Sequence, residues 1–314
     1  MPAESFPRVL RTRPHYRIFV CLGMLVLAGF LTGCGGAVYE KRLEFTQKYY
    51  DYIDRLNRNL ATQFANYGIS LRVPKQFTEI PAPPPRPRPA EGAEEEDAEE
   101  PVDPRQPKFF DEPLPGLLAA WQANLTTVDG GGSTTQGKGH LYLLGNYDYW
   151  RTFKTPREIG DPLKFHEDVM NMLVDQLQIV LDERQRGTAT DRVNKWFNEV
   201  VPEAADEEFV RKKEFTTITL VPEESGDDEE QPRMQYQVYL YQSGDMQIVL
   251  LYVLPRSVSA GEELDHRILL SLQTAEVSPD KPVGAAAAQG PGGAAPAGAP
   301  GGATAPPAGN SPAF

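Results

Sequence analysis

Apolar side chains recur every three or four positions between residues 38 and 67, and Lys, Arg, Asp and Asn separate them. This spacing predicts an amphipathic helix that ends at Gly68, a common C-cap residue. The helix could act as a coiled-coil or partner helix, or its stripe could pack against the folded part of the chain. Packing is favoured because the stripe is rich in Tyr and lacks the Leu and Ile of a coiled-coil seam. The stripe consists of Phe45, Tyr49, Tyr52, Leu56, Leu60, Phe64 and Tyr67.

The pattern becomes alternating over residues 69–80, which predicts the first strand of the folded domain. Residues 81–107 then combine a Pro-rich run with an acidic run, and residues 91–103 hold eight acidic side chains and no basic one. Charge repulsion and the lack of apolar groups predict a disordered insert. The alternative is a docking site for a basic partner, but a solvated linker is the more usual role of such a run.

Residues 108–277 form the main foldable stretch. Apolar residues at helical spacing follow Asp161 and predict the clearest helix of the chain over residues 163–181. A shorter helix is predicted over residues 191–200, and Pro202 is expected to end it.

The strand candidates are residues 141–149, 215–221, 235–242 and 246–254. Gly244 and its polar neighbours predict a tight turn that joins the last two candidates in an antiparallel hairpin. The final candidate is almost continuously apolar, which predicts a buried central strand. Ser259 and Glu262 have capping-box spacing and open a last helix. The predicted fold is α+β, an antiparallel sheet with packed helices, preceded by a long amphipathic helix, with a disordered linker and C-terminal tail.

The C-terminal residues 278–314 are of low complexity. Of these 37 residues, 12 are Ala, 8 are Gly and 8 are Pro. Such a segment buries too little apolar surface to order itself, so a disordered tail is predicted.

The N-terminus has the parts of a secretory signal, with a basic leader, an apolar run over residues 18–30 and small residues at its end. The apolar run is shorter than the ~20 residues that span a bilayer as a helix. The tetrad Leu31-Thr32-Gly33-Cys34 resembles the lipobox of bacterial lipoproteins, in which the Cys carries lipid and the signal is cut just before it. The resemblance implies that residues 1–33 are a signal peptide and that Cys34 is lipidated. The alternative is an uncleaved membrane anchor.

This resemblance predicts a place in the bacterial cell envelope. Acyl chains such as palmitate on Cys34 would hold the protein at a membrane, facing the periplasm or the exterior. Gly35 stands where some two-membrane bacteria have the Asp that retains lipoproteins at the inner membrane, so the outer membrane is favoured. Residues 34–68 would then be the tether and the amphipathic helix.

The net charge of the chain is −13, and residues 34–314 hold 27 basic and 43 acidic side chains. This balance argues against a nucleic-acid partner, because clustered Lys and Arg dominate affinity for phosphate backbones. With 4 His and 2 Cys, metal sites of several ligands and disulfide scaffolds are largely excluded, and no cofactor is predicted. The partners left are the membrane, through Cys34, and an envelope protein or a cell-wall glycan; the oligomeric state stays open.

Motifs that carry chemistry are scarce. Residues 132–139 match a phosphate-binding loop except that Gly139 stands where Ser or Thr would hold magnesium, and no strand is predicted before them, so a flexible loop between strands is favoured. His166, beside Glu167 and Asp168, is a weak candidate for a metal or acid/base site, and a solvated helix position is the plainer interpretation. His140 and His266 lie apart from it. No catalytic, cofactor-binding or metal residue is predicted.

Four tyrosines lie on both faces of the predicted hairpin, and Tyr offers a flat apolar area with a polar tip. They predict an interaction surface, although core packing on one face explains at least half of them. The four are Tyr236, Tyr239, Tyr241 and Tyr252.

Three functional hypotheses remain. The leading one is a lipid-anchored envelope protein with a non-catalytic interaction or scaffolding domain. The second is a small-ligand or glycan-binding lipoprotein that uses the Tyr-bearing sheet. The third is an envelope hydrolase whose carboxylates come from distant segments and meet beside His166 or His140.

Overall fold

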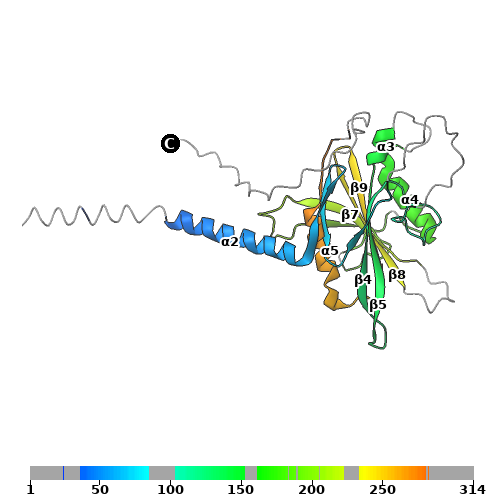
Figure 1. The fold of residues 1–314 in the computed structure, drawn as a ribbon, viewed down its shortest axis with the longest axis horizontal. Helices are drawn as coiled ribbons and strands as arrows, with labels where there is room; N and C mark the ends of the chain where they lie inside the picture. Colours follow the sequence, from blue (N-terminus) through cyan, green and yellow to red (C-terminus); the bar gives the residue numbers. More distant parts are fainter. Residues whose placement is uncertain are drawn as a thin grey trace, which may run out of the picture.

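The computed structural model describes residues 24, 36–84, 103–152, 161–182, 184–188, 190–204, 206–222, 233–280 and 282. It confirms the α+β class, with helices packed on antiparallel sheets and a long helix in front of them (Figure 1). Cys34, most of the predicted signal peptide, most of the acidic insert and the tail beyond residue 282 lie outside the described residues. None of the helices in the described part is long and apolar enough to cross a membrane.

A seven-stranded sheet forms the centre of the domain, in the order β3-β4-β5-β9-β8-β7-β6, with every neighbouring pair antiparallel. All ten residues of β9 are buried between β5 and β8, which confirms the predicted central strand. Ser243 pairs with Met246, and Gly244 adopts a φ of 57° in the turn, as the predicted hairpin requires. The strands are β3 (Thr78–Ile80), β4 (Leu117–Val128), β5 (Thr134–Gly145), β6 (Phe197–Val201), β7 (Lys213–Leu220), β8 (Met234–Ser243) and β9 (Met246–Pro255).

One side of this sheet, here called the closed face, is covered by a second sheet and by helix α5 (Leu264–Thr274). The second sheet has the order β1-β2-β10 and comprises β1 (Leu60–Asn66), β2 (Ile69–Pro74) and β10 (Glu276–Val277). Leu264, Ile268 and Leu272 of α5 are buried, as their spacing predicts. The closed face therefore contains a continuous apolar core between two layers.

The other side, here called the groove face, carries helix α4 (Phe165–Leu177) after a short 3-10 turn, η1 (Pro162–Lys164). The Asp161 carboxylate accepts a hydrogen bond from the Leu163 N–H and starts the turn, as the sequence predicts. The predicted helix runs too far, because Gln178 adopts a left-handed conformation and Val180 is 96% exposed. A shorter helix, α3 (Tyr147–Thr152), follows β5 where the sequence pattern continued the strand.

Helix α2 (Gly36–Asn59) is the long amphipathic helix, but it ends eight residues earlier than its apolar pattern predicts. Positions four apart share one face of a helix and also one face of a regular strand, so the spacing of Leu60 and Phe64 does not distinguish the two structures. Both residues form β1 against β2, with a register shift between Leu60 and Gln63. Residues 69–80 are not the single first strand that their pattern predicts: β1 precedes them, and they form β2 and β3, which belong to different sheets, with Phe77 buried between the two strands.

Two further expectations are wrong. Residues 191–200 form no helix: after an irregular segment, β6 begins at Phe197 and pairs with β7. The capping box is only half formed, because the Ser259 hydroxyl caps the short turn η2 (Ala260–Glu262), whereas the Glu262 carboxylate accepts from the Thr126 N–H at 2.9 Å. That bond ties the turn to β4 instead of closing the helix start.

The C-terminal half of α2 is fixed to the domain. Tyr52 and Leu56 are buried against Leu270 of α5, so this part of the aromatic stripe packs on the folded domain as expected, whereas Phe45 and Tyr49 remain exposed. Arg55 forms an ion pair with the buried Asp206 on the segment before β7. Burial and the charge of Asp206 raise the pKa of Tyr52 to about 12, so this ring stays a neutral phenol.

Candidate functional site

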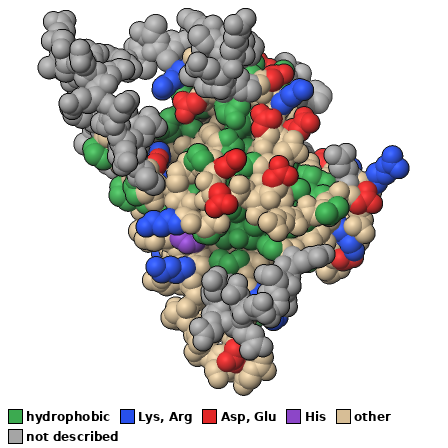
Figure 2. Space-filling model, turned by 90° about the vertical axis from the view of Figure 1, so that its right-hand side faces the viewer, with side chains coloured by type: hydrophobic (Ala, Val, Ile, Leu, Met, Phe, Trp, Pro, Cys, Tyr) green, Lys and Arg blue, Asp and Glu red, His purple; other side chains and the backbone are tan. Residues whose placement is uncertain are grey.

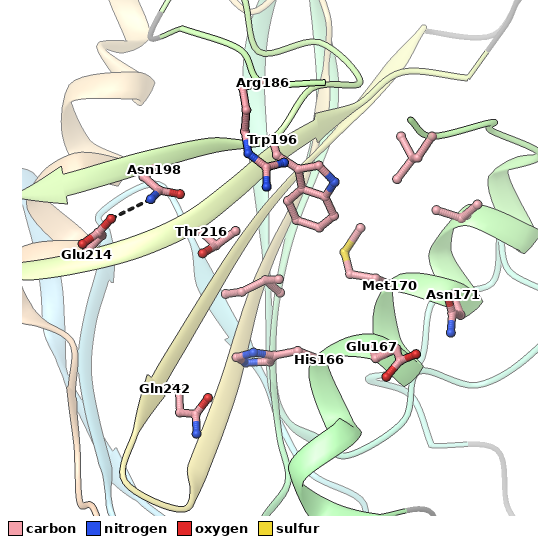
Figure 3. Close-up of a pocket in the computed structure, with 13 residues that line it drawn as sticks. His166, Glu167, Met170, Asn171, Arg186, Trp196, Asn198, Glu214, Thr216 and Gln242 are labelled. Carbon is pink, nitrogen blue, oxygen red and sulfur yellow. Dashed lines mark hydrogen bonds between the residues drawn. The ribbon is translucent and has the colours of Figure 1, made fainter. Parts of the chain in front are cut away.

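A groove of about 910 Å³ opens on the groove face between α4 and strands β6, β7 and β8 (Figure 3). Its walls come from three parts of the chain that are separated in sequence and are brought together only in the folded structure. Helix α4 contributes His166, Glu167, Met170, Asn171 and Val174; the segment before β6 contributes Leu181, Arg186 and Trp196; the strands contribute Asn198, Glu214, Thr216, Leu240 and Gln242.

The groove begins where one face of the sheet changes from apolar to polar. Leu240 on β8 pairs with Thr216 on β7, which pairs with Asn198 on β6, so these three side chains form a row on the groove face. Leu240 is buried, whereas Thr216 and Asn198 are exposed. Helix α4 covers the apolar end of the row, and the polar end lies beyond it.

Strand β7 shows the same change along its own length. On the groove face Glu214 and Thr216 are exposed, while Ile218 and Leu220 are buried in the core under α4. Phe215, on the opposite side of the strand, is fully buried in the closed face. Strand β7 is thus buried on the closed face, whereas its first residues are exposed to solvent on the groove face.

Trp196 provides the largest apolar side chain of the groove. Its backbone is held by the Gly187 N–H, which donates to the Trp196 carbonyl at 2.8 Å, and by its own N–H, which donates to the Gln185 carbonyl. The indole packs partly against the core under α4, and Figure 3 shows it between the side chains of Arg186 and Met170. Sequence analysis missed this residue because it placed Trp196 inside a helix.

The polar groups of the groove are mixed in charge. The Asn198 amide donates to the Glu214 carboxylate at 2.6 Å (Figure 3). Glu167 projects from α4 on the other side of the groove, and Arg186 supplies a guanidinium. Figure 2 shows the side of the molecule that carries α4, where acidic and apolar side chains gather in the middle and Lys and Arg lie toward the margins. An anionic ligand would gain little attraction there.

His166 has a structural position at the floor of the groove. Its Nε2 lies 3.0 Å from the Ile248 carbonyl, and its backbone N–H donates to the Gln247 side chain. Burial lowers the pKa of His166, while backbone bonds with Ile248 and Tyr241 oppose that shift. The ring fastens α4 to the sheet, so the interpretation of His166 as a solvated helix residue is wrong.

The predicted tyrosine surface is wrong for three of its four members. Tyr239 and Tyr252 are buried in the closed face with their ring centroids 5.9 Å apart, and Tyr236 is buried on the groove face against Phe110. Tyr241 is half-buried and packs on the ring of Phe215. Burial raises the pKa of Tyr239 and Tyr252, as is usual for phenols in an apolar core. Tyr236, Tyr239 and Tyr252 therefore fill the core and do not present a surface.

The Gly-rich segment is part of a hairpin, and β5 already begins at Thr134. The turn lies at residues 129–133, where the Asp129 carboxylate accepts from the Ser133 N–H at 2.7 Å. A Cβ on Gly139 would lie 2.7 Å from Leu125 Cδ1, so this glycine allows close packing and belongs to no phosphate cradle. The prediction of a loop over residues 132–139 is therefore wrong from Thr134 onward, because those residues form β5 and only residues 132 and 133 lie in the turn.

The other histidines lie apart from the groove. His140 on β5 stacks on Tyr142 with ring centroids 6.0 Å apart, and burial together with the Lys138 charge lowers the pKa of His140. His266 is exposed on α5. Within the described residues, no group of three or more His, Cys, Asp or Glu side chains is placed to hold a metal ion.

Comparisons with known proteins add little. No family model matches the chain, and no curated protein matches it. One matching solved structure is a crystal structure of a protein from Bacteroides thetaiotaomicron VPI-5482, at 10% identity and a TM-score of 0.27. The match covers 69% of this chain and 48% of that one, so the chain spans about half the length of that protein. A likeness of this size assigns neither fold nor function.

Proposed function

We propose that the protein is a lipid-anchored protein of the bacterial cell envelope whose α+β domain is a non-catalytic binding module, with the groove between α4 and the sheet as its recognition site. The carrying observation is the row Leu240, Thr216 and Asn198, which changes from buried apolar to exposed polar beside Trp196. Ligand sites commonly combine an apolar wall with a few polar groups that fix orientation. The lipobox at Cys34 supports the envelope location from the sequence alone.

The chemistry of the groove favours a glycan as the ligand. Trp196 offers a flat apolar area, on which the C–H face of a sugar ring packs well. The groove is also lined by the amides of Asn171, Asn198 and Gln242, a group that both donates and accepts hydrogen bonds and so suits hydroxyl and acetamido groups. One N–H of Asn198 and one of Gln242 already donate to Glu214 and to the Gly244 carbonyl. The location implied by Cys34 makes a cell-wall glycan the accessible ligand of this class.

The test is co-sedimentation of the purified chain with isolated cell-wall sacculi. Wild-type protein should bind, and Trp196→Ala should weaken binding by about tenfold or more, corresponding to roughly 1.4 kcal/mol. Trp150→Ala is the matched control, because Trp150 lies on α3, donates to the Asp245 carbonyl and does not line the groove. Absence of wild-type binding, or an equal loss in both variants, would contradict the proposal.

The lipid anchor has its own test. Labelled palmitate should enter the wild-type protein in cells and should be absent from Cys34→Ser. Unchanged labelling of that variant would exclude acylation at Cys34.

One observation favours a hydrolase as the second candidate. Glu167 and Glu214 line the groove from opposite sides, and a glycosidase needs two carboxyl groups that flank the scissile bond. In that case the wild-type chain would release reducing ends from the glycan, while Glu167→Gln and Glu214→Gln would each bind without cleaving. Binding without any release of reducing ends would leave the binding module as the function.

A further inference from the structure

Helix α2 has a wide apolar arc that the domain only partly covers. At 3.6 residues per turn, its apolar positions fall within about half of the circumference, and its acidic residues occupy the other half. The apolar half contains Val38, Tyr39, Leu43, Phe45, Tyr49, Tyr50, Tyr52, Ile53 and Leu56. Such segregation is the pattern of a helix that lies at an apolar boundary along its whole length.

One edge of this arc packs against the domain. Phe209 contacts Phe45, Tyr49 and Tyr52, with ring centroids 5.5, 6.0 and 5.6 Å away. The other edge is Tyr39, Leu43 and Tyr50, which are 64%, 50% and 64% exposed. Figure 1 shows this part of α2 projecting from the domain on the side of α5. Within the described residues these three side chains stay at least half exposed, although the Tyr50 ring lies edge-on to that of Tyr49 at 6.0 Å.

The connection to Cys34 determines what lies near this edge. Only Gly35 separates Cys34 from the first residue of α2. One extended residue spans at most about 3.6 Å, so lipid on Cys34 brings the first turn of α2 to the headgroup region. Residues 39–50 rise only about 16 Å along the helix axis. A helix tethered this closely has its exposed apolar edge within reach of the membrane.

We propose that the N-terminal half of α2 lies in the plane of the membrane interface, with Tyr39, Leu43 and Tyr50 inserted among the lipid headgroups and the first methylenes. This inference rests on the proposed lipidation of Cys34. Tyrosine is enriched at membrane–water interfaces, and an amphipathic helix binds there through its apolar area. Residues 39–51 carry three basic and three acidic side chains, so their charges balance and apolar insertion, not charge, drives the contact.

The processed protein suits site-directed spin labelling, because Cys21 leaves with the signal and acylation blocks the Cys34 thiol. Single cysteines would replace Tyr39, Leu43 and Tyr50 on the exposed apolar edge. Glu40, Gln47 and Asp51 on the polar half are the matched control positions. The acylated proteins would be reconstituted in phosphatidylcholine vesicles and labelled with nitroxide.

Labels on the apolar edge should collide severalfold more with lipid-dissolved oxygen than with an aqueous nickel complex, and the control labels should show the reverse. If the protein floats with the vesicles but all six labels are exposed to water, the inference is overturned and the lipid anchor is kept. Spin–spin broadening confined to the apolar edge, with no oxygen preference, would assign that edge to a second copy of the chain and also overturn it. Failure to float would overturn the anchor together with this inference.

Discussion

The two faces of the seven-stranded sheet share the same central strand but are covered differently. From β9, Leu250 and Tyr252 project into the closed face, while Val249 and Leu251 project into the groove face, and all four are fully buried. The difference arises at β7 and β6, where Thr216 and Asn198 leave the groove face polar. A recognition site can thus form on a well-packed sheet where its covering helix ends.

The closed face is also sealed by polar contacts at its margin. The Ser271 hydroxyl of α5 donates to the Arg72 carbonyl of β2 at 2.6 Å, and the Lys213 ammonium of β7 donates to the Gln273 carbonyl at 2.6 Å. These bonds join the second sheet, α5 and the edge of the large sheet. The groove face has α4 as its main cover, and His166 and Gln247 fasten that helix to the sheet.

The largest expected difference between the faces is the stability effect of removing a buried leucine. Leu250→Ala should lower the free energy of unfolding by about 4 kcal/mol, because the closed face cannot collapse around the cavity, whereas Leu240→Ala should cost about 2 kcal/mol beside the groove. Urea denaturation followed by circular dichroism measures both. Equal losses would show that the groove wall is as enclosed as the core.

A smaller effect is expected where α2 joins the closed side. Asp206→Asn removes the charge that pairs with Arg55 and should cost about 1 to 2 kcal/mol, because Asp206 is buried. Glu44→Gln is the control, since both side chains of the Glu44–Lys48 pair are exposed to solvent, which screens their attraction, and the change should leave stability nearly unaltered. A loss in Glu44→Gln as large as in Asp206→Asn would contradict the role of this ion pair.

The smallest effect is a pH dependence specific to the groove face, where burial lowers the pKa of both His140 and His166 from the ordinary value of 6.5. Below pH 6.5 the folded state then binds fewer protons than the unfolded state. The contribution of these histidines to stability is therefore complete above pH 6.5 and is lost as the pH falls below 6.5. Unfolding measured at about pH 7.5 and 5.5 should show this loss, and the His140→Gln/His166→Gln double variant should show less of it. An unchanged pH slope in the variant would place the titrating groups elsewhere.

Much of the sheet could be predicted from local pattern, because the continuous apolar run of β9 and the Gly244 turn each allow few alternatives. The end of α2 could not, since Leu60 and Phe64 fit helical and strand periods equally and only pairing with β2 decides between them. The same ambiguity, in the segment around Trp196, produced the wrong helix over residues 191–200.

The site was harder to predict than the fold. Asn198, Thr216 and Leu240 become neighbours only through the register of three strands, which sequence spacing does not contain. A usable signal was present in β7, where Glu214, Phe215 and Thr216 alternate before the continuously buried residues 217–220. The change from alternating to continuous burial in β7 marks the place where α4 stops covering the groove face. The tyrosines of β8 and β9 were predicted to form a surface because their spacing does not reveal burial. When both faces of a strand are covered, an aromatic residue on either face can be buried.

Recognition is assigned to the groove face alone, and the closed face takes no part in it. The most direct measurement is NMR of the isotope-labelled protein titrated with soluble cell-wall glycan fragments. Chemical-shift changes should be confined to α4, the segment around Trp196 and the groove-facing residues of β6, β7 and β8. Changes centred on the closed face, or no changes at saturating glycan, would contradict the account.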